Sequence, residues 1–340
     1  MVNRRCFNQQ ISFMSFKLLP RLIAFPIIAC IGQCWWMANY SPTNMAASMI
    51  WIPLLAYAWF CIGGLTHEIV HGNLNSTPLV VTVSAKIIGT VLGIPHTVYR
   101  EVHMRHHAYL NTPLDWEMWP YSDPRASLRF RRIFVWFDIV FAVVATPIIW
   151  GRICFSKESP VPLPIRRTMK IEYCGIAVFW LGTIGTGIWM HQTGRFQFQP
   201  EHFIFALPPL LATAVNGLRK IMDHVGTSSF DPLHGTRTVV GPSFITRTLS
   251  FFNFDLAVHG PHHRYPKLEC SSLKQRMEEI SEANPGQRYP IFPSFFAAFV
   301  DTLVAMVRNP GVGVNAGCTD DLSHLPSQTS AKVSSETHWG

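Results

Sequence analysis

The sequence predicts an all-α membrane protein that carries a histidine-rich cap at one membrane face. Of its 340 residues, 48% are hydrophobic and only 14% are charged, whereas soluble domains carry roughly 25% charged residues. A third observation is that eight of the fifteen histidines fall into three short motifs. We therefore expect four transmembrane helices, with interfacial helices between them and the histidine motifs at their cytoplasmic ends.

The first two transmembrane helices are expected at residues 18–38 and 45–65, where apolar runs are long enough to cross a bilayer. The uncharged link between them indicates a turn on the non-cytoplasmic side. The second helix continues into His67 and His71, which therefore emerge on the cytoplasmic side. Residues 79–95 form a shorter apolar run. A crossing there would separate the first two motifs, so this run is expected to be interfacial or re-entrant.

The second half of the chain is expected to cross the membrane twice more. Residues 133–150 lie between two basic segments, and basic residues collect on one side of a membrane, which favours an interfacial helix. Residues 171–190 and 203–218 are the third and fourth expected crossings, joined by a nearly neutral loop. Residues 291–307 are expected to form one more interfacial helix.

We expect a single membrane domain at residues 18–308. A polar, basic tail at residues 1–17 precedes it, and a Gly-, Ser- and Thr-rich tail at residues 309–340 is expected to be disordered. The net charge of +8 comes from basic residues beside apolar runs, as on cytoplasmic loops, and no nucleic-acid-binding motif is present. The eight cysteines form no Cys-x-x-Cys pair, so we expect free thiols.

The three histidine motifs share helical spacing, which places each set of rings on one helix face. Two crossings precede the first motif and two separate the second from the third, so all three face one side. Ionisable groups gathered beside apolar helices indicate a functional site. Imidazole suits Zn, Cu, Fe or Ni, and so many rings fit two metal ions better than one. The motifs are His67 and His71; His103, His106 and His107; and His259, His262 and His263.

One alternative rests on the first motif alone. His67-Glu68-Ile69-Val70-His71 matches His-Glu-x-x-His, in which two histidines bind zinc and the glutamate is the general base of a metalloprotease. A zinc peptidase needs only one further ligand, so this reading leaves most of the histidines unused. It is the less favoured alternative.

The order of the three motifs, between paired apolar spans, resembles the membrane fatty acid desaturase superfamily over about residues 45–270. That superfamily includes acyl-lipid desaturases and related carotenoid and lipid hydroxylases. The resemblance implies a non-haem di-iron centre, O2 as co-substrate and desaturation of a fatty acyl or lipid chain. A hydroxylase or ketolase acting on a carotenoid or another lipid stays open, because the motifs do not separate these reactions.

The resemblance extends to residues outside the motifs. Arg219, Asp223 and His224 are similar to the family's Arg-x3-Glu-His segment, with Asp in place of Glu, which implies that His224 is a ninth metal ligand. Metal-bound histidine usually donates its other ring N–H to a carboxylate or carbonyl, and no catalytic residue beyond the ligands is expected. The candidates for supporting the ligands are Glu68, Asn111, Asp115, Arg219 and Asp223.

The expected partners are a lipid or fatty acyl substrate and an external electron donor, such as a ferredoxin or a cytochrome b5-like protein. We expect the donor to dock on basic cytoplasmic residues at Arg129, Arg131 and Arg132. Gly63 and Gly64 could line a substrate path, although helix packing is the favoured reading. The resemblance implies a bacterial inner membrane or endoplasmic reticulum, with the histidine motifs in the cytoplasm.

Overall fold

The computed structural model describes residues 21, 25, 27–41, 43, 45–73 and 78–320. The regular elements among these residues are helices, apart from a short parallel pair in which β1 (Thr238–Val239) lies beside β2 (Ile291–Phe292). The all-α class is therefore confirmed. The tail at residues 1–17 lies outside the described residues.

Within the described part of the chain, two helices are long and apolar enough to cross a membrane: α3 (Met45–His71), over Ala46–His71, and α8 (Leu163–Gln192). They correspond to the second and third expected crossings. The first expected crossing is described mainly as η1 (Ile28–Gly32) and α2 (Gln33–Ala38), a short apolar helix. The fourth corresponds to η2 (Pro200–Ala206) and the start of α9 (Leu207–His224).

Two bent helix pairs flank the bundle. The chain bends by 99° between α4 (Pro78–Leu92) and α5 (His96–Ala108), and by 118° between α6 (Leu128–Val140) and α7 (Ala142–Phe155). Gly93, with a φ of 73°, ends α4 at a position that favours glycine. If each pair counts as one span, up to four spans are present. The sharp bends also fit the re-entrant or interfacial segments expected at these places.

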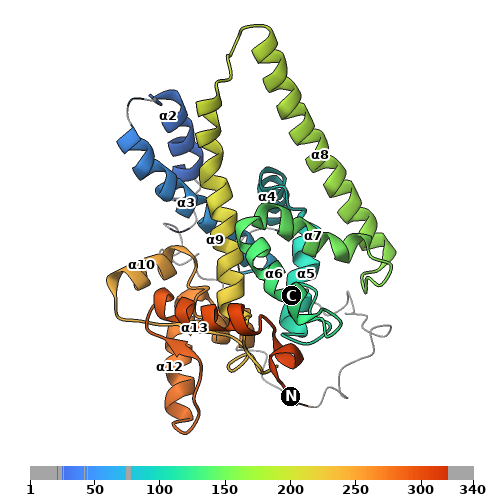
Figure 1. Cartoon of the computed structure of the whole chain (residues 1–340), viewed down its shortest axis with the longest axis vertical. Coiled ribbons are helices and arrows are strands. Elements are labelled where there is room, and N and C mark those ends of the chain that lie inside the picture. Colours follow the sequence, from blue (N-terminus) through green and yellow to red (C-terminus); the bar gives the residue numbers. More distant parts are fainter. Residues whose placement is uncertain are drawn as a thin grey trace, which may run out of the picture.

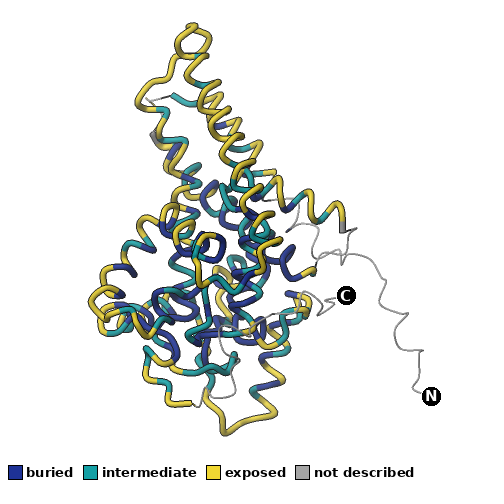
Figure 2. Tube along the Cα trace, turned by 90° about the vertical axis from the view of Figure 1, so that its right-hand side faces the viewer, coloured by how far each residue is buried: buried dark blue, intermediate teal, exposed yellow. Residues whose placement is uncertain are grey.

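The helices are arranged so that one end of the molecule is slender and the other broad (Figure 1). α8 and α9 rise to a common tip, while α10 (Phe244–Phe252), α12 (Leu273–Ala283) and α13 (Phe295–Arg308) lie at the opposite end. Figure 2 shows that the tip is exposed and that buried residues gather in the broad end. The exposed apolar side chains of α8 suit contact with lipid.

The chain after α13 is part of the packed structure up to Asp320. Val312 is fully buried, and its N–H donates to the Tyr121 carbonyl at 3.1 Å. Gly313 has a φ of 52° and donates its N–H to the Thr227 carbonyl at 2.9 Å. The expectation of disorder from residue 309 onward is therefore corrected for residues 309–320, where backbone hydrogen bonds compensate for the polar composition.

Candidate metal centre

Nine buried or half-buried histidines meet where the broad-end termini of α3 and α9 approach α5 and α11 (His259–Arg264). They form two groups, and within each group the candidate ligand atoms lie within 4.8 Å of one another. We call these the five-histidine group and the four-histidine group. The first consists of His67, His71, His103, His107 and His262, and the second of His106, His224, His259 and His263.

The Nε2 atoms of neighbouring rings face one another at short distances. In the five-histidine group, His71, His103, His107 and His262 form a chain whose successive Nε2 atoms lie 3.0, 3.1 and 3.2 Å apart. Two nitrogens bound to one ion at 2.0–2.1 Å, at a right angle, lie about 3.0 Å apart. The spacing therefore suits a metal ion.

The four-histidine group repeats this arrangement. The Nε2 atom of His224 lies 3.2 Å from that of His106 and 2.8 Å from that of His259, and the latter lies 3.0 Å from that of His263. His224, which only the resemblance implicated, is thus central to its group. The donor set is imidazole throughout, which fits the borderline ions of the first transition row.

Two further observations show that the rings fit a metal. The Nε2 atom of His67 is buried and, within the described part of the chain, has no hydrogen-bond partner. Such an unpaired group costs about 1–3 kcal/mol, which a metal ion would offset. In addition, burial lowers the pKa of His259, His262 and His263 well below the usual range. They are therefore neutral, the form that ligates metals.

Carboxylates lie within hydrogen-bond distance of Nδ1 in several histidines, the ring nitrogen opposite the Nε2 atoms that face one another. Nδ1 of His106 lies 2.8 Å from Asp115 Oδ2, and Nδ1 of His103 lies 2.9 Å from Glu117 Oε2. Carboxylate partners of this kind fix the tautomer and the ring orientation of metal ligands. Nδ1 of His259 instead lies 3.1 Å from the backbone carbonyl of Leu256.

Glu117 was not among the residues predicted to support the ligands. It lies in the same loop as Asp115, and this alternation of acidic residues was the signal in the sequence. Burial alone would raise the pKa of Glu117, but the neighbouring His103 outweighs this and lowers it to about 2. Glu117 is therefore ionised and accepts a hydrogen bond from His103.

The loop that carries Asp115 is shaped by Asn111. Asn111 has a φ of 59°, and its N–H donates to Asp115 Oδ2 at 3.0 Å. Its side-chain amide donates to the carbonyls of Ser229 and Gly235 at 3.0 and 2.7 Å. Asn111 thus supports His106 through Asp115 and connects the second motif to the loop after α9.

Arg219 and Asp223 lie one turn apart on α9. Arg219 donates to Asp223 Oδ2 at 3.2 Å, and this oxygen is 3.7 Å from Nδ1 of His259. The Leu256 carbonyl is nearer to that nitrogen, so Asp223 lies near His259 without a direct hydrogen bond to it.

The position of Glu68 argues against the zinc peptidase reading. Its Oε1 atom lies 3.1 Å from Nδ1 of His67, and its Oε2 atom accepts a hydrogen bond from Asn73 at 3.0 Å. The carboxylate is therefore engaged at the Nδ1 side of the ring, away from Nε2. A general base must instead face the reacting water.

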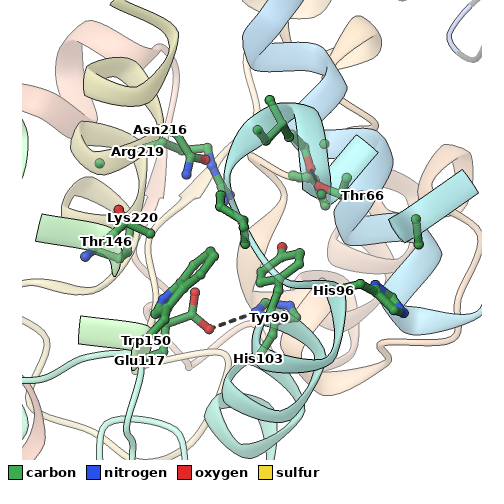
Figure 3. Close-up of a pocket in the computed structure, with 18 of the residues that line it drawn as sticks. Thr66, His96, Tyr99, His103, Glu117, Thr146, Trp150, Asn216, Arg219 and Lys220 are labelled. Atoms are coloured by element: carbon green, nitrogen blue, oxygen red, sulfur yellow. Dashed lines mark hydrogen bonds and ion pairs between the residues drawn. The ribbon is translucent and has the colours of Figure 1, made fainter. Parts of the chain in front are cut away.

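A cavity of about 80 Å³ adjoins the five-histidine group (Figure 3). It lies between α3, α4, α5, α7 and α9, and His103 and Glu117 form part of its wall. Gly63 and Gly64 also line it, and a Cβ atom on Gly63 would meet nothing within 4 Å. The favoured reading of Gly63 as a packing residue is therefore corrected.

The comparisons with known proteins agree with this geometry. The family model for fatty acid desaturases matches residues 44–295, which include all nine histidines of the two groups. No curated protein matches the chain at the significance required. The matched span is most of the chain and contains the buried histidine groups, so this protein belongs to the fatty acid desaturase family.

Proposed function

We propose that this enzyme uses O2 and two iron ions to introduce a double bond into a fatty acyl or lipid chain. The observation that supports the proposal best is the pair of adjacent imidazole groups, of five and four rings. Family membership gives the class of reaction, an oxidoreductase acting on a fatty acyl chain. The presence of two groups supports two ions.

The nine histidines would hold the ions, with each group binding one. When bound, iron supplies the activation of O2 and the removal of hydrogen from an unactivated C–H bond. The protein's own residues orient and protect this site. Asp115 and Glu117 fix the rings of His106 and His103. Burial of the rings keeps water away from the reacting carbon.

The electron donor is proposed to be an external acidic protein, such as a ferredoxin or a cytochrome b5-like protein. Of the docking residues expected from the sequence, Arg129 and Arg132 are exposed, whereas Arg131 is buried and Arg132 also donates to the Arg308 carbonyl. A small cavity lined by His71 and Arg100 adjoins the five-histidine group. We propose that the donor docks over Arg100, whose side chain is 49% exposed.

The apolar helices indicate a membrane protein. We propose that the histidine groups face the cytoplasm of a bacterial inner membrane or of the endoplasmic reticulum. Electrons and protons would then arrive from the cytoplasm, while the substrate comes from the bilayer. We also propose that the chain from residue 18 through the packed segment after α13 forms one domain.

The proposal is tested by metal analysis combined with lipid mass spectrometry. We expect two irons per chain, and lipids of the expression host that are lighter by two hydrogens. A product heavier by one oxygen would identify a lipid hydroxylase instead. A single zinc per chain, with hydrolytic activity that survives the substitution His263→Ala, would overturn the proposal in favour of the peptidase.

A further inference from the structure

We propose that the cavity beside His103 binds an uncharged hydrogen-bonding group of the substrate. The enzyme would then act on a carbon close to a hydroxyl, amide or carbonyl group, rather than in the middle of an unsubstituted chain. This inference rests on the proposed function and specifies the substrate class. It starts from polar side chains of the cavity that have no hydrogen-bond partner among the described residues.

Asn253 is the first of these side chains. It lines the cavity and is only 5% exposed, yet its side-chain amide makes no hydrogen bond to any described residue. Its Oδ1 atom would lie 2.6 Å from a Cβ atom on Gly64, so the glycine leaves room for the amide. Buried amides nearly always have partners, and this amide lines the open space of the cavity. A bound polar group could therefore supply its missing partner.

Tyr99 and Asn216 present two more such groups to the same cavity. Figure 3 shows them on different sides of the space, on α5 and α9 respectively. Among the described residues, neither the Tyr99 hydroxyl nor the Asn216 amide has a hydrogen-bond partner. The Tyr99 ring is stacked on Trp150, with centroids 4.8 Å apart and planes at 17°. It is therefore held in place, and its hydroxyl is pre-oriented for a ligand.

The charged residues of the cavity are already paired, which decides the charge of the ligand. Lys220 lies 2.7 Å from Asp138, Arg219 lies 3.2 Å from Asp223, and Glu117 accepts from His103. Removing a charge from such a pair is costly in a buried site. The hydroxyl, the two amides and the buried Nε of Arg219, which has no partner among the described residues, remain available, and they match a neutral group that both donates and accepts hydrogen bonds.

The size and position of the cavity place this polar group near the reacting carbon. A volume of about 80 Å³ has room for several water-sized groups, but not for a whole acyl chain. The Tyr99 ring lies 5.4 Å, centroid to centroid, from the ring of His103. A group held by the Tyr99 hydroxyl is thus within a few bonds of a carbon at the five-histidine group. The rest of the chain would extend into the bilayer.

Ligand-induced stabilisation tests the inference directly. The iron-loaded protein in lipid nanodiscs is mixed with hexadecan-1-ol, hexadecanamide or n-hexadecane at equal mole fraction, and the melting temperature is measured. Because only binding to the folded state raises that temperature, we expect the alcohol and the amide to raise it and hexadecane to have little effect. Tyr99→Phe and Asn216→Leu should each weaken binding of the alcohol about tenfold.

Tyr173→Phe is the matched control, since Tyr173 lies outside the cavity lining, and it should bind the alcohol like the wild type. Equal stabilisation by hexadecane and the alcohol, or unchanged binding in both cavity variants, would overturn the inference. Water alone would then occupy the cavity.

A second measurement is the position of the new double bond in cells supplied with each probe. If hexadecane is desaturated with O2 as readily as hexadecan-1-ol, the inference about the cavity is wrong, whereas the proposed function is still supported.

Discussion

Replacing Asp115 with Asn should damage the protein far more than replacing Glu117 with Gln, although both changes neutralise a carboxylate beside a histidine. Asp115 uses both oxygens. Oδ2 accepts from Nδ1 of His106 and the N–H of Asn111 at 2.8 and 3.0 Å, and Oδ1 accepts from the N–H groups of Glu117 and Met118, each at 3.2 Å. An asparagine has one oxygen and one amino group.

Whichever way the new amide faces, two of the four donors therefore lose their acceptor. Hydrogen bonds to charged groups contribute about 1.5–3 kcal/mol each, so the loss is about 3–6 kcal/mol. For Glu117, the only described side-chain partner is His103, at Oε2, and a glutamine can keep an oxygen there. A changed partner of a metal ligand lowers metal affinity about 10- to 100-fold, which corresponds to about 1.4–2.8 kcal/mol.

The assay compares the two variants at one scan rate. Thermal unfolding of the iron-free proteins is followed by circular dichroism, and iron content is measured after dialysis against a weak chelator. We expect Asp115→Asn to melt well below the wild type and to lose the ion of the four-histidine group. Glu117→Gln should melt near the wild type and show only weaker binding in the five-histidine group. Equal losses in the two variants would refute the reasoning.

Three further predictions concern the ligands, the cavity and the donor. His224→Ala should lower the iron content from two ions to one per chain and abolish desaturation, because His224 is central to its group. Gly63→Leu should reduce turnover at least tenfold at unchanged iron content, since the new side chain fills the cavity. Arg100→Glu should slow reduction by an acidic donor at low ionic strength, and the difference should fade at high salt.

Each of these predictions has a control. His234→Ala should retain two irons, because His234 lies outside both groups. Gly182→Leu also adds a side chain to open space, but outside the cavity lining, so its turnover should stay near that of the wild type. For Arg100→Glu, reduction by a small uncharged reductant should be unchanged. Iron loss in His234→Ala would contradict the role given to His224. Equal turnover loss in both glycine variants would contradict the role of the cavity. A salt-independent defect in Arg100→Glu would contradict the proposed donor site.

The sequence was sufficient to predict that the three histidine motifs meet, but not how they divide. On α5, His103 and His107 are one turn apart and join the five-histidine group, whereas His106 joins the other. The side chains of consecutive helical residues point about 100° apart, so the neighbours His106 and His107 can reach different ions. His262 likewise separates from His259 and His263. This division depends on how α5 and α11 are placed, which spacing alone does not specify.

Other features depended on contacts between distant segments. The role of Glu117 follows from the path of the loop after α5, and the packing of Val312 follows from its hydrogen bond to Tyr121. Composition suggested disorder around Val312 because it reflects the polarity of the segment and does not show which distant residues it contacts. The helical class and the long apolar helices were accessible from the sequence, since hydropathy reports directly on length and environment.

The nine imidazoles have a consequence for how the enzyme matures. A ligand set made only of imidazole nitrogens binds Cu²⁺, Ni²⁺ or Zn²⁺ more tightly than Fe²⁺, following the Irving–Williams order. Affinity therefore does not select the iron proposed above, and the burial of His106 and His259 would slow exchange once the rings are enclosed. The identity of the metal is then decided during folding by which ion the cell supplies. Protein overproduced in a copper- or zinc-rich medium should accumulate mismetallated and inactive, even though it is correctly folded.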